Sequence, residues 1–296
     1  MEKSIKRYWP VFILPTMAAF MIGFVVPFLE GIYLSFCDFT TIKDASFVGL
    51  ENYAKILSDS RAGEDIMFTL KFTIATVALE LIIGFAAALI MNRAFKGRGL
   101  VRAAILVPWA IPTSVSAMMW KFIYNDQYGM FNDILYRLGI IDGYKAWLST
   151  RSGSFMAMVI TDVWKTAPYM ALLLLAGLQV IDEGLYEAAK IDGCTFFQTF
   201  YKIILPVLKP ILATVALLSF RGGWNEYILP LVFTMTDASK RPLTVGVTML
   251  KNAGDGAAAW NIMFAGATIA IVPILVIYIF ASKYFINGMT AGAVKG

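Results

Sequence analysis

The stretch IMFTLKFTIATVALELIIGFAAALIM, residues 66–91, contains only two charged side chains, Lys71 and Glu80. An α-helix rises 1.5 Å per residue, so this stretch is long enough to cross the roughly 30 Å of hydrocarbon in a bilayer. A run this long and this apolar is typical of a transmembrane helix. Outward from it, five further stretches have the same character, which gives six predicted spans at residues 11–36, 66–91, 101–121, 154–178, 211–233 and 260–285.

The composition agrees with a membrane protein. Apolar residues make up 59% of the chain, charged residues 15%, and the mean hydropathy is +0.70. A soluble chain is closer to half apolar and a quarter charged. No low-complexity run or Pro/Gly/Ser-rich linker divides the sequence, so we expect an all-α polytopic protein with residues 1–296 as a single transmembrane domain.

The first apolar stretch also has features of a secretory signal, because Lys3, Lys6 and Arg7 precede it. It is longer than the hydrophobic region of a signal, and no small-x-small cleavage site follows it. We therefore predict that this stretch is a retained helix.

Charge indicates which side of the membrane each loop occupies. If the N-terminus is inside, the inner segments hold 12 Lys and Arg in 68 residues and the outer segments hold 10 in 87. Most of the difference comes from the short loop with Arg93, Lys96, Arg98 and Arg102, and short loops follow the positive-inside rule best. This predicts cytoplasmic N- and C-termini and a cytoplasmic segment 180–210.

Several chemistries are excluded or disfavoured by the residues present. The chain has no histidine, and no nucleophile–base pair or metal cluster is visible, so neither an enzyme nor a metal site is expected. Cys37 and Cys194 fall on opposite sides and cannot pair with each other. No basic stripe interleaved with aromatic residues suggests nucleic acid.

Polar residues inside the spans are candidates for a solute path. Asp162 and Lys165 lie three positions apart and are expected to form a local ion pair, whereas Glu80 must find its partner across the bundle. The cluster Trp224-Asn225-Glu226-Tyr227 combines aromatic faces with hydrogen-bonding groups, as carbohydrate recognition requires, although Trp and Tyr also anchor helices at interfaces. In a continuous helix, Trp224 and Tyr227 share one face. The candidate path residues are Trp224, Asn225, Tyr227, Asp162 and Trp164.

A motif with fixed spacing lies between the fourth and fifth spans, in GLYEAAKIDGCTFFQTFYKIILPVLKP (184–210). Its fixed positions are Glu187, Ala188, Ala189, Gly193, Ile203, Leu205 and Pro206. They predict a short helix ending at glycine, a reversal, and a second helix ended by proline, a knob suited to a groove on a soluble partner. The motif resembles the cytoplasmic coupling loop in membrane subunits of ATP-binding-cassette (ABC) importers.

The resemblance extends over nearly the whole chain. Segments 46–59, 162–181, 224–233 and 287–296 are similar to the sugar and glycerol-phosphate permeases of the maltose-transporter family. The first of these segments is typical of one member of the permease pair, and the last two are typical of the other. Which half of the heterodimer this chain forms therefore remains open.

The resemblance implies a type I ABC importer permease that itself catalyses no reaction. It implies a second homologous permease, a dimer of cytoplasmic ATPases that binds ATP and Mg²⁺, and an extracytoplasmic binding protein that delivers a sugar. It also assigns the motif residues to ATPase coupling, and the tail 288–296, with Thr290 and Lys295, to the space between the ATPases. Composition alone favours a disordered tail.

Two alternatives keep the membrane architecture but change the function. One is an importer of the same type for a polyamine, phosphate or glycerol phosphate. The other is an ion-coupled secondary transporter, which needs no ATPase.

Overall fold

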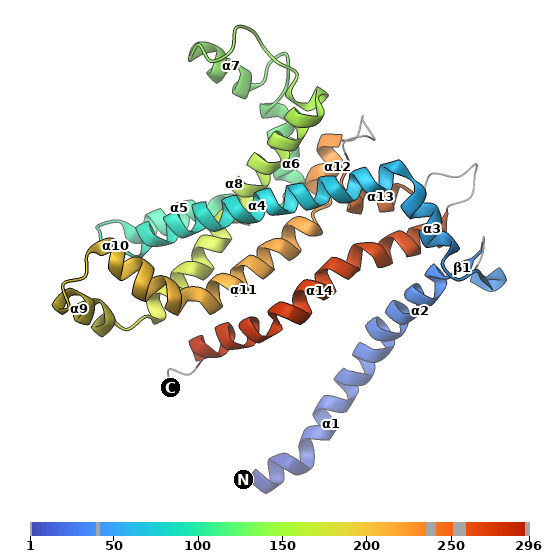
Figure 1. Ribbon diagram of the computed structural model, residues 1–296, viewed down its shortest axis with the longest axis horizontal. Coiled ribbons are helices and arrows are strands. Elements are labelled where there is room, and N and C mark those ends of the chain that lie inside the picture. Colours follow the sequence, from blue (N-terminus) through green and yellow to red (C-terminus); the bar gives the residue numbers. More distant parts are fainter. Residues whose placement is uncertain (1, 40–41, 235–240, 251–258, 294–296) are drawn as a thin grey trace. The chain divides into compact units, whose positions relative to one another are not determined.

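The long apolar stretches form helices in the computed structural model, which describes residues 2–39, 42–234, 241–250 and 259–293 (Figure 1). The helices are α1 Glu2–Phe20, α2 Val26–Ser35, α3 Glu51–Ser58, α4 Ser60–Asn92, α5 Arg98–Ala110, α6 Thr113–Ile123, α7 Met130–Arg137, α8 Arg151–Val180, α9 Glu183–Ile191, α10 Phe196–Thr199, α11 Leu205–Trp224, α12 Ile228–Thr234, α13 Leu243–Met249 and α14 Trp260–Ala293. Two-residue strands, β1 Cys37–Asp38 and β2 Ser46–Phe47, pair antiparallel with Cys37 opposite Phe47.

The predicted spans all lie on these helices. Within the described residues, five helical segments are long and apolar enough to cross a membrane, and α5 with α6 makes a sixth if the pair forms one span. The second and fourth spans extend beyond their predicted limits, to 60–92 and 151–180. The all-α, multi-span fold class is therefore confirmed.

The third predicted span is not one helix. α5 and α6 meet at 90° across Ile111 and Pro112. Proline restricts the residue before it to extended backbone, and Ile111 accordingly has ψ of 133°. The break exposes carbonyl groups at the end of α5, and Lys165 Nζ donates to the carbonyl oxygens of Ile111 at 2.7 Å and Trp109 at 3.4 Å.

The prediction that Lys165 forms a local ion pair with Asp162 is therefore wrong. Its ammonium group lies on the carbonyl end of α5, and no Asp162–Lys165 ion pair occurs within 4.0 Å among the described side chains. The spacing on α8 permits the pair, but the broken helix offers two acceptors that have no intrahelical donor.

The fifth predicted span is also interrupted. α11 ends at Trp224, Asn225 adopts φ −94° and ψ 4°, and α12 begins at Ile228. The Glu226 carboxylate accepts a hydrogen bond from the Leu229 N–H at 3.1 Å and so occupies the amino end of α12. The expectation of a continuous helix, in which Trp224 and Tyr227 share a face, is therefore wrong.

The chain forms two compact units. Unit 1 comprises residues 1–63 and 247–272, and unit 2 comprises residues 64–246 and 273–296. Unit 2 contains α4 through α12, and its core lies where α4, α8 and α11 pack together. Buried residues of this core include Met91, Met170, Leu174, Leu178, Leu208 and Val215.

Two glycines let these helices approach closely. A Cβ on Gly84 of α4 would lie 3.1 Å from Met170 Cβ and 3.3 Å from the Ala167 oxygen, both on α8. A Cβ on Gly223 of α11 would lie 2.9 Å from Thr76 Oγ1 on α4. Small residues at such contacts allow close packing of helices in a membrane.

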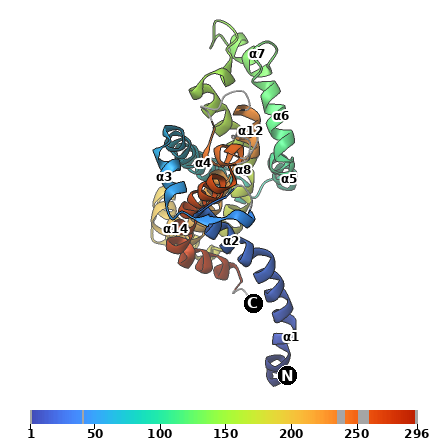
Figure 2. The same cartoon turned by 90° about the vertical axis from the view of Figure 1, so that its right-hand side faces the viewer.

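The 30-residue helix α8 separates two exposed segments of unit 2. The loop with α7 precedes its first residue, and the loop with α9 and α10 follows its last. Thirty residues span about 45 Å, so the two loops lie on opposite sides of a membrane crossed by α8. Figures 1 and 2 show α7 projecting beyond the ends of α6 and α8.

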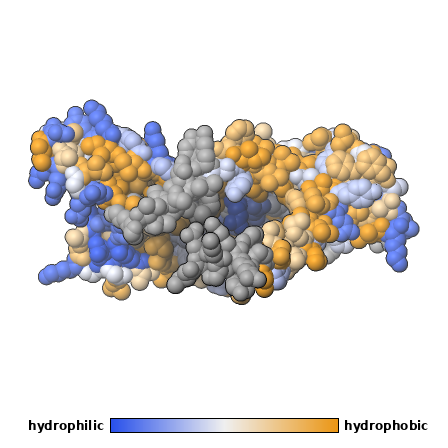
Figure 3. Space-filling model, turned by 90° about the horizontal axis from the view of Figure 1, so that it is seen from below, coloured by the Kyte–Doolittle hydropathy of each residue, from blue (hydrophilic) through white to orange (hydrophobic). Residues whose placement is uncertain are grey.

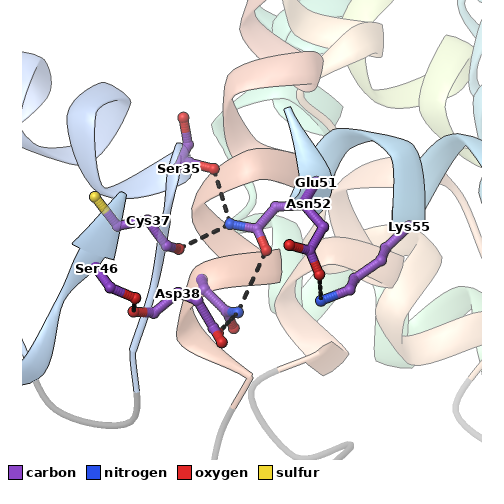
Figure 4. Close-up of polar contacts among 8 residues, drawn as sticks. Ser35, Cys37, Asp38, Ser46, Glu51, Asn52 and Lys55 are labelled. Atoms are coloured by element: carbon purple, nitrogen blue, oxygen red, sulfur yellow. Dashed lines mark hydrogen bonds and ion pairs between the residues drawn. The ribbon is translucent and has the colours of Figure 1, made fainter. Parts of the chain in front are cut away.

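In unit 1, a buried amide holds the hairpin to the helices. Asn52 of α3 donates to the carbonyl oxygens of Ser35 at 3.0 Å and Cys37 at 2.8 Å (Figure 4). Asn261, at the start of α14, donates to Asp38 Oδ1 at 2.7 Å. Cys37 and Cys194 are both free thiols, and Cys37 is buried. Modification of Cys37 by a membrane-impermeant thiol reagent is therefore not a suitable measurement of which side of the membrane this residue faces.

Large apolar side chains cover much of the surface, coloured orange in Figure 3. On α4, for example, Ile74, Ile82 and Ile90 are each more than half exposed. Such residues suit contact with lipid or with other transmembrane helices.

Candidate functional site

The segment between α8 and α11 begins with a capped helix. The Asp182 carboxylate accepts a hydrogen bond at the start of α9. At the other end, Cys194 N–H donates to the Ala189 oxygen at 2.9 Å, and Gly193 N–H donates to the Lys190 oxygen at 3.2 Å. This is a Schellman motif. Gly193 has φ of +73°, so the backbone reverses at a position that other residues enter only with strain.

A second cap follows the reversal. Thr195 Oγ1 accepts from the Gln198 N–H at 3.3 Å, and Gln198 Oε1 accepts from the Thr195 N–H at 2.8 Å. This capping box starts α10, which continues through a π-helical turn, Phe200–Ile204, into α11.

The sequence predicted that Pro206 ends the second helix of the loop, and this prediction is wrong. Pro206 lies at the second residue of α11, directly after the π-helical turn, where the hydrogen-bond register changes and a residue without an N–H is accommodated. Just before it, the Leu205 N–H donates to the Phe200 oxygen, a wider i to i+5 turn. The helix is therefore continuous past the proline.

The motif residues differ in their accessibility. Glu187, Ala188 and Pro206 are exposed, Ile203 and Leu205 are half-buried, and Gly193 lies at the exposed turn. Ala189 is only 1% exposed. Only Ala188 of the two alanines can therefore present its side chain to a partner, while Ala189 packs within the chain.

Apolar side chains that the motif does not include surround these residues. Ile191, Phe196, Phe197 and Tyr201 are 85%, 68%, 70% and 62% exposed. Sequence reasoning missed them, although large apolar residues in a loop outside the spans are the available signal. Partial burial raises the pKa of the neighbouring Tyr186 phenol. The loop thus presents an apolar surface beside the Glu187 carboxylate.

A second group of functional candidates lies inside unit 2. Glu80 of α4 is 2% exposed, and it accepts a hydrogen bond from the Ser219 hydroxyl of α11 and contacts the buried Asp162 carboxyl of α8. The Glu226 carboxylate is close enough to act electrostatically on both acids. The expectation that Glu80 finds its partners across the bundle is confirmed.

Glu80 ends a polar row on α4, which we call the polar seam: Thr69, Thr73, Thr76 and Glu80. All four side chains are at most 2% exposed. Thr69 Oγ1 accepts from the Leu243 N–H at 2.8 Å, but Thr73 Oγ1 is buried without a hydrogen-bond partner. The spacing of four, three and four residues places the row on one face of the helix. This spacing is visible in the sequence and was the signal for the missed threonines.

The predicted path residues do not form one cluster. Trp224 is buried and stacks on Phe220, with ring centroids 5.7 Å apart. Asn225 is exposed and donates to the Arg221 oxygen, and Tyr227 is half-buried.

Asp162 and Trp164, both on α8, contact different groups. Asp162 faces Glu80, whereas Trp164 packs against Trp120 and lines an apolar cavity between α4, α5 and α8. Of the predicted path residues, Asp162 is therefore the one whose contact with the polar seam is established.

The predicted tail residues lie at the end of the described chain. Helix α14 runs to Ala293 and so includes Thr290, while Lys295 lies outside the described residues. No group of three or more Asp, Glu or Cys residues that could hold a metal ion occurs in the described part of the protein.

The chain belongs to the family of binding-protein-dependent transport system inner membrane components, whose model matches residues 80–290. It is therefore a multi-pass permease of the type I ABC importer class. It is 40% identical over 239 residues to the trehalose/maltose transport system permease protein of Thermococcus litoralis, covering 80% of each chain. It is 31% identical to the sulfoquinovosyl glycerol transport system permease protein of Agrobacterium fabrum, covering 84% of this chain and 83% of that protein.

Solved structures share the fold. A bacterial ABC transporter involved in alginate import has a chain that matches with a TM-score of 0.78 at 22% identity, covering 99% of both chains. The same score is found for the alginate transporter in complex with an alginate pentasaccharide-bound periplasmic protein, with 95% of both chains covered.

Proposed function

We propose that this permease imports a sugar or oligosaccharide, driven by ATP hydrolysis in separate cytoplasmic subunits. The substrate class is supported by relatives whose names specify trehalose, maltose and sulfoquinovosyl glycerol transport. A second homologous permease and an extracytoplasmic binding protein complete the proposed transporter. ATP and Mg²⁺ are bound by the ATPase partners, and this chain needs no cofactor of its own.

The observation that carries the proposal is the doubly capped loop at the end of α8. Two adjacent caps and a left-handed glycine fix its backbone, and its exposed face combines Glu187 with bulky apolar groups. Rigid apolar surfaces with a charged contact suit a groove on another protein. In this proposal the loop and both chain termini are cytoplasmic, and the tail containing Thr290 and Lys295 lies at the ATPase interface.

We further propose that the polar seam and Asp162 line part of the solute path. Hydroxyl and carboxylate groups can exchange hydrogen bonds with a sugar, and buried polar groups in a membrane bundle typically mark such a path. Asn225 is exposed and Trp224 is buried in a stack with Phe220, so these two residues contribute less to the path. Trp164 and Tyr227 are its proposed aromatic walls.

Reversal of the Glu187 charge tests the coupling role. Glu187→Lys places a cation where the ATPase groove is proposed to accept a carboxylate, and we expect ATP-dependent uptake to fall at least tenfold, a loss of about 1.4 kcal/mol in coupling. Membrane insertion should be unchanged because Glu187 is exposed. The readouts are ATPase co-purification and uptake in proteoliposomes.

Asp126→Lys is the matched control. Asp126 is also exposed, but it lies beyond the other end of α8. Equal loss of uptake in both variants, or normal ATPase association and uptake in Glu187→Lys, would contradict the coupling role.

A further inference from the structure

An apolar cavity of 470 Å³ opens on unit 2 between three helices. Helix α4 contributes Leu79, Ile83 and Ala87 to its wall, and α5 and α8 contribute the rest: Ala104, Ile105, Pro108, Ile160, Val163, Trp164, Ala167 and Pro168. Every lining side chain is apolar apart from the indole N–H of Trp164. The cavity therefore offers no set of hydrogen-bonding groups for a sugar.

The cavity lies at a defined distance along α4 from the C-terminal end of that helix. Ala87 is five residues before the end of α4, and Leu79 is thirteen residues before it. At 1.5 Å per residue, the cavity runs from about 8 Å to about 20 Å back along α4 from its C-terminal end, a length of about 12 Å. A single leaflet contributes about 15 Å of hydrocarbon, so this length is comparable with that of one acyl chain.

Basic residues gather at the shallow end of the cavity. Arg93, Lys96, Arg98 and Arg102 lie within ten residues, and residues 92–113 contain no acidic residue. Arg98 and Arg102 precede the cavity residue Ile105 by seven and three positions, so they lie on the same side of α5. The positive-inside rule accounts for the charges, but not for an apolar cavity that begins on the same helix face.

Arg102 connects the two parts of this arrangement. Its Nη2 donates to the Met91 oxygen at 2.9 Å and so ties α5 to the end of α4, while its Nε has no hydrogen-bond partner. The guanidinium has further N–H groups and keeps its positive charge, so it attracts an anionic phosphate to this end of the cavity.

We propose that the cavity binds one acyl chain of an anionic phospholipid whose headgroup is held by the basic loop 93–102. Length, apolar lining and positive charge all match that ligand, and basic pockets between transmembrane helices are suited to acidic lipid headgroups. The basic loop is separate from the proposed coupling loop and from the polar seam, and Trp164 is the one candidate path residue that also lines the cavity. The test measures lipid binding and not uptake, so it does not depend on the transported substrate.

The test measures lipid retained by the purified transporter in native mass spectrometry, during titration with phosphatidylglycerol or phosphatidylcholine. We expect one phosphatidylglycerol to bind preferentially. Lys96→Gln combined with Arg98→Gln should weaken its binding about 30-fold, because each basic residue near a membrane surface contributes about fivefold. The matched charge control combines Lys202→Gln, in the π-helical turn before α11, with Lys209→Gln, in the first turns of α11. It should leave that binding unchanged.

Filling the cavity tests the acyl-chain part independently. Ala104→Phe places a ring in the cavity and should abolish retention of the selective lipid, and Ala104→Leu should weaken it less. Equal phosphatidylglycerol binding in the charge variant and its control would overturn the proposal. A second result would also overturn it: Ala104→Phe retains the lipid but no longer associates with the second permease. That result would assign the cavity to a transmembrane helix of the partner permease.

Discussion

Two spans of this permease are interrupted, and each break leaves backbone groups at a helix end without an intrahelical partner. Side chains of opposite charge bind these groups at the two breaks. Where α5 ends, the Lys165 ammonium group meets free carbonyl oxygens, and where α12 begins, the Glu226 carboxylate meets a free N–H. Both placements have the sign that the helix dipole favours. The Lys165 contact bridges 54 residues, whereas the Glu226 contact spans three. A break supported from a distant helix depends on tertiary packing, and a locally capped break does not.

The largest stability effect is therefore expected at Lys165. Lys165→Met keeps an unbranched apolar stem but leaves the Ile111 and Trp109 oxygens without this donor. We expect a loss of about 1.5–3 kcal/mol, because a hydrogen bond from a charged donor contributes about that much and the shorter contact, to Ile111, is partly buried. Unfolding of the purified protein in detergent measures the effect.

Lys165→Arg retains a donor and should keep most of the stability. If Lys165→Met is as stable as the unaltered protein, water or another donor satisfies these carbonyl groups and the comparison of the two breaks fails.

A smaller effect is expected at Glu226. Glu226→Ala removes the acceptor for the Leu229 N–H, and loss of a helix cap typically costs about 1 kcal/mol. Glu226→Gln retains an oxygen and should recover most of that loss. The same detergent unfolding measurement applies, and a greater loss in Glu226→Gln than in Glu226→Ala would rule out capping as the main role.

The smallest effect on stability is expected at Thr73, next to the second break, where a Cβ on Gly223 would meet Thr73 Cα at 3.5 Å. Thr73→Val replaces a hydroxyl that has no hydrogen-bond partner, so stability should change by less than about 0.5 kcal/mol. If the polar seam lines the solute path, the KM for uptake should nevertheless rise.

Thr214→Val on α11 is the control, because Thr214 lies outside the polar seam and its hydroxyl donates to the Pro210 oxygen of its own helix. Its uptake kinetics should be unchanged. Unchanged uptake kinetics in Thr73→Val would remove this hydroxyl from the path.

The sequence was sufficient for those features that depend on local patterns. Hydropathy located five helical segments that can cross a membrane and the bent pair α5 and α6, and Gly193 marked the reversal of the loop. The partners of Lys165 and Glu80 could not be identified in this way, because they lie on helices far away in the chain. The identity of a contact across a bundle is set by how helices rotate and approach each other, which periodicity does not determine.

Local chemistry was also insufficient at three positions. Pro206 is tolerated in the first turn of a helix as readily as beyond its end, so proline alone did not specify where the helix stops. Ala189 fits either a docking surface or a packed interior. At Trp224, the helix end depends on the cap that Glu226 provides to the following helix, so a continuous helix was the wrong geometry for the cluster.

ATP-dependent uptake in proteoliposomes tests the central claim most directly. The permease is reconstituted with its partner permease and ATPase, the binding protein and radiolabelled trehalose or maltose are supplied at the face bearing α7, and ATP is supplied at the face bearing α9 and α10. We expect sugar accumulation that requires both ATP and the binding protein. Accumulation driven by an ion gradient without ATP would contradict it.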